Sequence, residues 1–282
     1  MELGFFSPEI SGQNVEEVFA KARALGFTQV QYDFETSHGE EMPAGFGPGE
    51  LERVAQAARD NGVSIAAVNG TFNMVDSDPI RLEAYIRRFT AIAQACAYFG
   101  CKIVTLCTGS KSLEGMWRYS PATAGEPVFQ QLLETTRRIL PVAESYGLTL
   151  GVETEASNVV FTARRTRRYL DEVASPYLKV IMDCANLFPA GTARRENVAA
   201  TIGEAFSLLG GDIVLAHGKD VAEGDAVRFA SPGMGIVDYD LYFNLLKKIG
   251  YAGPLILHGV HDPADFAPSI AIMREKLLAA GL

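Results

Sequence analysis

The sequence predicts an α/β protein that folds as a (β/α)8 barrel, also called a TIM barrel, over residues 1–282 as one domain. Short apolar runs alternate with helical periods along the whole chain, and these runs are mostly apolar on both alternating faces. This pattern is typical of parallel strands that are covered on both faces. The length of 282 residues suits one such barrel. An open doubly wound sheet is less favoured, because no GxGxxG motif follows the first expected strand.

The eight expected strands are short and rich in β-branched residues. They cover residues 3–6, 28–34, 64–68, 102–107, 148–152, 178–182, 212–216 and 254–258. The segments between them show the three- and four-residue spacing of amphipathic helices. One example is the series Tyr85, Phe89, Ile92, Cys96 and Phe99. Eight such strand and helix units are what a (β/α)8 barrel requires.

Composition excludes several classes of function. A formal net charge of -9 argues against a surface that binds nucleic acid or anionic lipid. No apolar stretch reaches the length of about 18 residues needed for a membrane helix. Met1 leads directly into the first apolar run without the features of a signal peptide, and the four cysteines form no CxxC pair. We therefore expect a cytoplasmic protein that binds neither nucleic acid nor membranes.

Polar residues follow the apolar runs at the point where each expected strand ends. SIAAV is followed by Asn69, LTLGV by Glu153, LKVIM by Asp183, DIVLA by His217 and LIL by His258. In a barrel of this kind, the carboxyl ends of the strands meet at one mouth and form the active site. Carboxylate oxygens and imidazole nitrogens that converge there can replace the hydration shell of a divalent cation. The pattern predicts a metal site made by Glu153, Asp183, His217 and His258.

Several short motifs occur in the order and spacing of a known family. They are NGTFNM (69–74), TLCTGS (105–110), GVETE (151–155), MDCAN (182–186), AHGKD (216–220), PGMGIVD (232–238) and YAGPLILHG (251–259). Through them the chain resembles the xylose isomerase-like TIM barrels, which include sugar and sugar-phosphate isomerases and epimerases. The resemblance implies that Glu153, Asp183 and His217 bind a metal, and that the protein forms a homo-oligomer, a dimer.

The fourth metal-binding position departs from the family, because His258 stands where the family has a glutamate. An imidazole leaves the bound cation less neutralised than a third carboxylate does, and it moves the preference away from Mg²⁺. Mn²⁺ is therefore the favoured ion, with Co²⁺, Zn²⁺ and Mg²⁺ as alternatives. Two roles remain open for His258, which can ligate the metal or act as a catalytic acid and base.

A second group of residues is expected to bind the substrate or to support the metal site. Asn186 stands where the family has a substrate-contacting histidine or asparagine, and Glu155 lies two residues beyond Glu153. Lys219 and Arg228 can bind a hydroxyl, carboxylate or phosphate, or pair with nearby surface acids. Trp117, the only tryptophan, either covers a sugar ring or belongs to the core. The expected set is Asn69, Trp117, Glu155, Asn186, Lys219 and Arg228.

The predicted function is a metal-dependent isomerase or epimerase acting on a small sugar or sugar phosphate. Glu153 would move a proton next to a carbonyl, and the metal would stabilise the enediolate. Because His258 replaces the second carboxylate, a sugar or cyclitol dehydratase and a non-catalytic sugar-binding homologue remain alternatives. The DNA-repair endonucleases that share this fold use further histidine ligands, and the four histidines of this chain are too few for that chemistry.

Overall fold

Eight parallel strands close into a barrel with the neighbour order β1-β10-β7-β6-β5-β4-β3-β2. The computed structural model describes residues 1–282. The strands are β1 (Leu3–Phe6), β2 (Gln29–Tyr32), β3 (Ser64–Asn69), β4 (Ile103–Leu106), β5 (Thr149–Glu153), β6 (Leu178–Asp183), β7 (Ile213–Gly218) and β10 (Leu255–Leu257). The predicted fold class and all eight strands are confirmed, each within two residues at either end.

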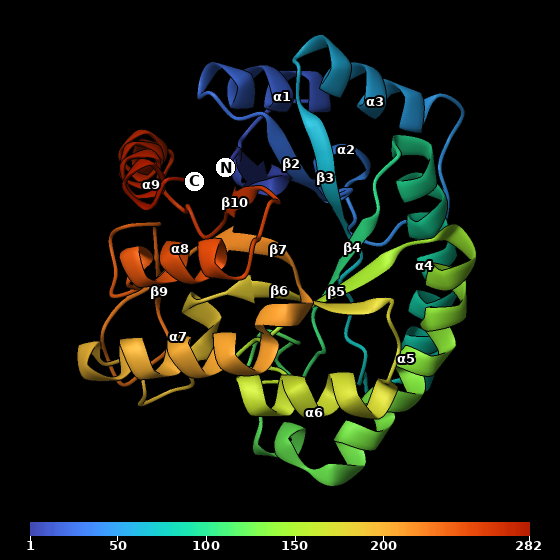
Figure 1. Ribbon diagram of the computed structural model, residues 1–282. Helices are drawn as coiled ribbons and strands as arrows, with labels where there is room; N and C mark the ends of the chain where they lie inside the picture. Colours follow the sequence, from blue (N-terminus) through green and yellow to red (C-terminus); the bar gives the residue numbers. More distant parts are fainter.

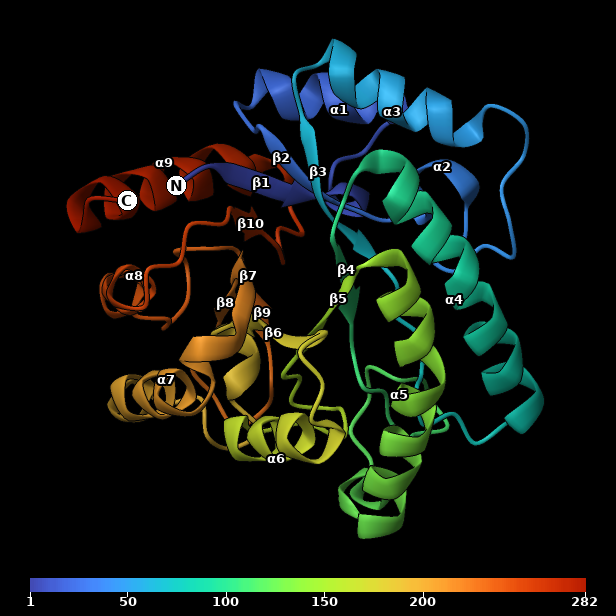
Figure 2. The same ribbon diagram turned by 45° about the vertical axis from the view of Figure 1, so that its right-hand side comes forward.

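Helices follow the strands and form the outer ring of the barrel (Figure 1). They are α1 (Val15–Ala24), α3 (Glu50–Asp60), α4 (Pro79–Phe99), α5 (Glu126–Tyr146), α6 (Ala163–Val173), α7 (Arg195–Leu209), α8 (Tyr239–Lys248) and α9 (Phe266–Ala280), with a short α2 (Glu35–His38) before α3. Local caps fix where several begin, because a side-chain oxygen accepts an otherwise unpaired N–H. Asp78 caps α4, Thr162 caps α6 and Asp238 caps α8 in this way. Figure 2 shows α9 close to β1, so that the two ends of the chain lie near each other.

The barrel interior contains two layers of inward-pointing side chains. The deeper layer is apolar and includes Ala67, Ile181, Leu215 and Ile256. Because side chains alternate along a strand, the residue two positions further on points inward again. These second residues are Asn69, Asp183, His217 and His258. The same alternation that fills the barrel with apolar groups therefore places polar groups at its mouth.

Two glycines make room for the bulky members of the apolar layer. A Cβ on Gly4 would lie 2.5 Å from the Cδ1 atom of Ile256, and one on Gly151 would lie 2.9 Å from Cγ1 of Ile181. Neither distance is tolerated between real carbon atoms. Gly151 lies two residues before Glu153, so the packing of Ile181 against it contributes to fixing the end of β5.

The segment after β7 folds back as a small hairpin, β8 (Asp220–Val221) with β9 (Phe229–Ala230). The buried carboxylate of Asp220 holds the following loop by accepting backbone N–H groups from Val221, Gly233, Gly235 and Val237. Asp220 is thus committed to the backbone, which leaves its neighbour Lys219 free to face the barrel mouth.

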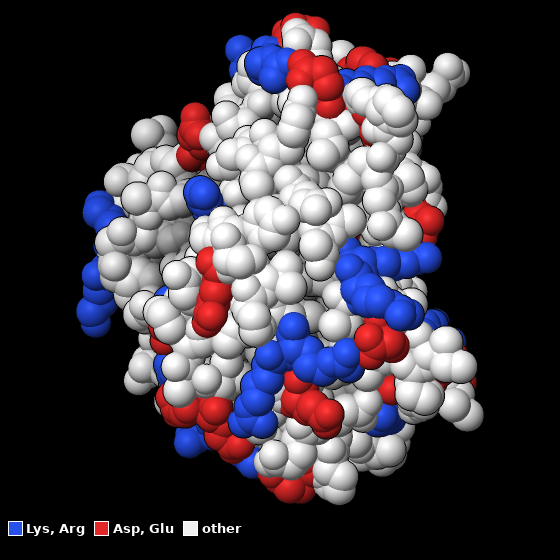
Figure 3. Space-filling model, turned by 90° about the vertical axis from the view of Figure 1, so that its right-hand side faces the viewer, with Lys and Arg blue, Asp and Glu red and all other residues white.

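The outer surface shows charges of both signs. Figure 3 views the side where α4 and α5 run, and on it the basic and acidic side chains lie next to each other. Such a mixture gives no extended positive field over this face. None of the helices combines the length and the hydropathy that crossing a membrane requires.

Candidate metal centre and substrate cavity

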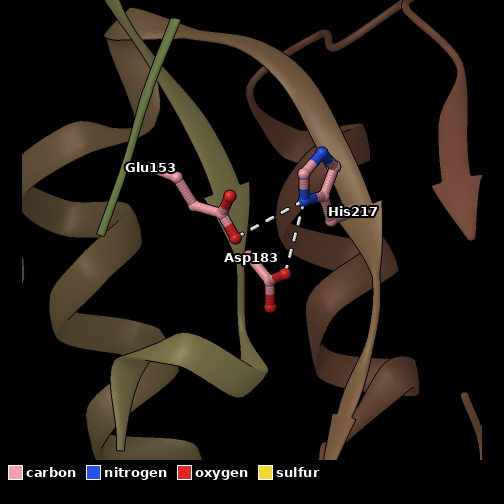
Figure 4. A group of neighbouring side chains, drawn as sticks. All are labelled: Glu153, Asp183 and His217. Carbon is pink, nitrogen blue, oxygen red and sulfur yellow. Dashed lines mark hydrogen bonds and ion pairs between the residues drawn. The ribbon is translucent and has the colours of Figure 1, made fainter. Parts of the chain in front are cut away.

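Three predicted ligands converge at the barrel mouth (Figure 4). Glu153 and Asp183 are the last residues of β5 and β6, and His217 lies in the neighbouring β7. All three are buried, and one ligand atom from each lies within 4.8 Å of the others. The Nδ1 atom of His217 is 3.3 Å from Asp183 Oδ2 and 3.6 Å from Glu153 Oε1. The arrangement leaves one point that all three side chains can reach.

The orientation of His217 suits metal binding. Its other nitrogen, Nε2, lies 2.8 Å from Oε1 of Gln31, which can accept the Nε2–H. Nδ1 then faces the two carboxylates, and a second group that fixes the ring in this way is typical of histidine ligands. Two carboxylates and one imidazole form a donor set suited to a divalent cation. The residues therefore fit the metal that the sequence predicts.

Burial and neighbouring charges shift the pKa values of the ionisable groups at the mouth strongly. Burial opposes protonation of His217, but the carboxylates of Glu153 and Asp183 raise its pKa to about 9. Burial would raise the pKa of Asp183, but Lys219 and His217 together lower it below the ordinary range. Burial raises the pKa of Glu155 to about 7, although Lys219 opposes the shift. Protonated His217 and Lys219 thus balance carboxylates that a bound cation would otherwise neutralise.

His258 lies beside this cluster and pairs with a residue from the other end of the chain. Its Nδ1 is 2.6 Å from Oε1 of Glu9, whose carboxylate also accepts the N–H groups of Gly259 and Val260. The His258 ring packs edge-on to His217, with centroids 5.3 Å apart. The close group of ligand atoms comprises Glu153, Asp183 and His217. With Nδ1 occupied by Glu9, Nε2 is the nitrogen that His258 has available.

A cavity of about 640 Å³ opens above the cluster and is called the central cavity below. It brings together most of the predicted site. Its lining includes Asn69, Trp117, Glu153, Glu155, Asn186, Lys219 and His258. Arg228 is exposed and is not part of the lining, although its neighbours Val227 and Phe229 are. Trp117 is 52% exposed and lies at the rim, so it does not belong to the core.

Three of the predicted residues form a hydrogen-bonded chain. Lys219 Nζ donates to Oδ1 of Asn186 over 3.0 Å, and Nδ2 of Asn186 donates to Glu153 Oε1 over 2.5 Å. The ammonium group also sits 3.6 Å from the centre of the Phe229 ring. Asn186 is therefore fixed in orientation, and Oε1 of Glu153 is held while Oε2 has only the weakly donating Cys107 thiol, at 3.9 Å.

Reasoning from the sequence missed several polar residues of the mouth. Gln31 orients His217, and Glu9 orients His258. Asp33 accepts from Asn69 Nδ2 at 2.5 Å, and burial raises its pKa to about 6. A signal for two of them is present, since Gln31 and Asp33 alternate within the second expected strand. Glu9 has no local signal.

Comparison with known proteins agrees with this fold. The family model described as "Xylose isomerase-like TIM barrel" matches residues 19–277. A 3-keto-D-glucoside 4-epimerase from E. coli has a similar structure (TM-score 0.74, 20% identity, 98% of this chain and 99% of that chain). So does a D-psicose 3-epimerase from Clostridium cellulolyticum H10, solved with D-tagatose (TM-score 0.71, 16% identity, 98% and 99%).

A xylose isomerase-like TIM barrel protein from Mycobacterium smegmatis, solved in complex with magnesium, is also similar (TM-score 0.74, 15% identity, 99% of this chain and 97% of that chain). At these levels of identity, each structure demonstrates a shared fold. The family model, in contrast, spans nearly the whole barrel. The chain belongs to the xylose isomerase-like TIM barrel family.

Proposed function

We propose that the protein is a metal-dependent sugar isomerase or epimerase that moves a proton at a carbon next to a carbonyl. The observation that carries the proposal is the buried group of Glu153, Asp183 and His217 at the floor of a polar cavity. A site that combines convergent metal ligands with an unengaged carboxylate oxygen suits proton abstraction next to a carbonyl. The epimerases among the structural relatives support the same reaction class.

Glu153, Asp183 and His217 would hold the metal through Oε1, Oδ2 and Nδ1, the atoms that already face one another. A divalent cation bound there supplies positive charge that polarises the carbonyl and stabilises an enediolate. Mn²⁺ is the ion that we favour, because imidazole shifts selectivity away from Mg²⁺. The pKa of His217, about 9, means that loading the site releases the proton from this ring at neutral pH.

Glu153 is the proposed base. Asn186 holds Oε1 of its carboxylate, whereas Oε2 meets only the Cys107 thiol and is therefore the atom available to take a proton. Lys219 stabilises this orientation of the Glu153 carboxylate indirectly, because its ammonium group donates to Oδ1 of Asn186 and so fixes the amide that holds Oε1. A carboxylate that is already held by Asn186 and contacted by Cys107 loses little conformational freedom when substrate binds.

His258 is the proposed partner for proton return. The contact between its Nδ1 and Glu9 supports this role over metal ligation, since it directs the remaining nitrogen, Nε2, away from Glu9. A carboxylate that accepts from Nδ1 keeps the proton on that side and stabilises the ring when it gains a second proton. The two strands that carry Asp183 and His217 separate Glu153 from His258, so the base and the acid approach a substrate from different sides.

The substrate is expected to be an uncharged sugar rather than a sugar phosphate. Carboxylates outnumber cations in the central cavity, where Glu41, Glu153 and Glu155 face Lys219 and the exposed Arg118. Lys219 already serves Asn186 and the buried acids. Hydroxyl groups can donate to these carboxylates, and the lining offers a phosphate no buried cation that lacks a partner.

One observation also favours a second candidate, a sugar or cyclitol dehydratase. An imidazolium backed by Glu9 is well suited to protonate a departing hydroxyl group. Elimination would use the same base, Glu153, and would differ only in what His258 protonates.

Incubation of the Mn²⁺-loaded protein with a panel of aldoses and ketoses in D₂O tests the proposal. We expect deuterium at the carbon next to the carbonyl together with an isomer or epimer, detected by NMR. Loss of water with formation of a deoxy-dicarbonyl product would favour the dehydratase. Tight binding of a sugar without any exchange would instead indicate a binding protein.

A further inference from the structure

A second cavity lies against the central cavity, and we call it the flank cavity. Its volume is about 420 Å³, and its wall is formed by segments 40–42, 71–77 and 110–116 together with Arg81 and Tyr85 of α4. Two residues, Glu41 and Thr71, line both cavities. The two spaces therefore meet at a shared wall of two polar side chains.

The flank cavity is held open by contacts among its own walls. Arg88 of α4 anchors the segment 40–42 by donating to Glu40 at 2.6 Å and to the carbonyl of Met42 at 2.8 Å. Asn73 ties the loop after β3 to the loop after β4, because its amide bonds to both the N–H and the carbonyl of Ser110. Such anchoring indicates a preformed space, which binds a ligand with less ordering cost.

Several polar groups that line the flank cavity have no side-chain hydrogen-bond partner within the chain. The carboxylate of Glu41 and the hydroxyls of Thr71 and Tyr85 make no side-chain hydrogen bond, although each lines the flank cavity. Burial, with a smaller contribution from Asp33, raises the pKa of Glu41 to about 7. None of these groups is a buried atom without a partner, so they reach solvent and are available to hydrogen-bond a ligand in the cavity.

The charges of the flank cavity select against anions. Its one cation, Arg81, is paired with the buried Asp76 through two hydrogen bonds of 2.5 and 2.7 Å. Glu40 is paired with Arg88, and Glu41 has no cation beside it. The ring of Tyr85 stacks on Phe72 and presents an apolar face beside the hydroxyl groups. Hydroxyl-binding groups next to an aromatic surface, without a free cation, suit a neutral carbohydrate ring.

The volumes leave room for more than one ring. On a scale of about 30 Å³ per water molecule in the liquid, the roughly twelve nonhydrogen atoms of a hexose occupy no more than about 360 Å³. The central cavity of about 640 Å³ exceeds this, and the flank cavity of about 420 Å³ accommodates a second ring. We propose that the substrate is a two-unit carbohydrate, a disaccharide or glycoside, whose second unit binds in the flank cavity. This inference rests on the proposed function, which places the reacting unit beside Glu153.

Calorimetric titration of the Mn²⁺-loaded protein with maltose, cellobiose and lactose, and separately with glucose and galactose, tests the inference. We expect at least one disaccharide to bind about tenfold more tightly than either monosaccharide. Ser77→Trp fills the flank cavity from an exposed loop position and should reduce the affinity for that disaccharide to the monosaccharide level. The control Ile80→Trp adds the same side chain at an exposed position outside the cavity and should keep the preference.

Tyr85→Phe gives a milder test that preserves the stack on Phe72. Loss of one hydrogen bond should weaken disaccharide binding about 2- to 10-fold. Equal affinity for one-ring and two-ring sugars, or a preference that survives Ser77→Trp, would overturn the inference. Deuterium exchange into a monosaccharide separates this inference from the proposed function. Exchange without a preference for two-ring sugars would support the proposed function and contradict the inference. A preference for two-ring sugars without exchange into any sugar would contradict only the proposed function.

Discussion

Helix α6 and the barrel mouth are both rich in charge, but they use it in opposite ways. On α6, Arg164 pairs with Glu204, Arg167 with Asp171 and Asp212, and Arg168 with Glu126 and Glu172. At the mouth, the buried cations Lys219 and protonated His217 face three buried carboxylates, and Oε2 of Glu153 has only the weakly donating Cys107 thiol.

The difference shows where charge contributes to structure and where it serves function. Exposed pairs such as those on α6 are screened by solvent and contribute little to stability. Buried carboxylates without full compensation cost stability, and such groups concentrate at functional sites. The mouth is therefore poised to accept a cation, whereas α6 is already balanced.

The largest effect should follow from changing the proposed base. Glu153→Gln keeps an oxygen for the metal and a partner for Asn186, but it removes the group that takes the proton. We expect deuterium exchange to fall by about 10²–10⁴-fold while the barrel stays folded. The measurement is NMR-detected exchange with circular dichroism as the folding control. Near-normal exchange would assign the base to another residue.

His258→Asn separates the two ends of the proposed proton transfer. The asparagine amide can occupy the place of Nδ1 and donate to Glu9, but it lacks the second ring nitrogen. We expect exchange at Glu153 to continue and product formation to fall by about 10²-fold or more. If deuterium exchange and product formation fall equally and Mn²⁺ binds more weakly, His258 is a metal ligand.

Removing one cation from each region tests the comparison directly. Lys219→Met leaves protonated His217 as the one buried cation beside Asp183, Glu153 and Glu155, and should lower the free energy of unfolding by about 3–5 kcal/mol. Arg164→Met on α6 should change it by no more than about 0.5 kcal/mol. Both are measured by urea unfolding in EDTA. Similar losses for the two variants would contradict the distinction.

A smaller effect is expected from Glu41→Gln. Burial raises the pKa of Glu41 from 4.5 to about 7, so the folded state holds this proton more tightly than the unfolded state does. Ionisation of Glu41 therefore lowers the free energy of unfolding. This loss is absent below about pH 4.5, grows between pH 4.5 and about pH 7, and is complete above pH 7. After discounting for partial exposure, the variant should be more stable than wild type by about 1–2 kcal/mol at pH 8 and equal to it at pH 4. A gain of the same size at both pH values would show that charge is not the cause.

Much of the site was predictable because a barrel strand has a period of two. Once the strands were placed, Glu153, Asp183, His217 and His258 had to share the layer above Ile181, Leu215 and Ile256. Gln31 could have been found by the same rule, since it alternates with Asp33 in the second strand.

Other features depend on loops, which have no such period. Glu9 lies 249 residues from His258 in the sequence, and only closure of the barrel brings them together. The hairpin that carries Phe229 turns this ring towards Lys219 and leaves Arg228 outside the lining, an orientation that composition does not encode. The flank cavity is likewise made by three loops and one helix, so no single segment signals it.

Anomalous diffraction from crystals grown with excess Mn²⁺ tests the central claim, that the mouth is a metal site. We expect one strong peak about 2.0–2.3 Å from donor atoms of Glu153, Asp183 and His217, and we expect it to disappear in Asp183→Asn crystals. A wild-type map with no peak at these residues, or with a peak elsewhere that survives the substitution, would contradict the account.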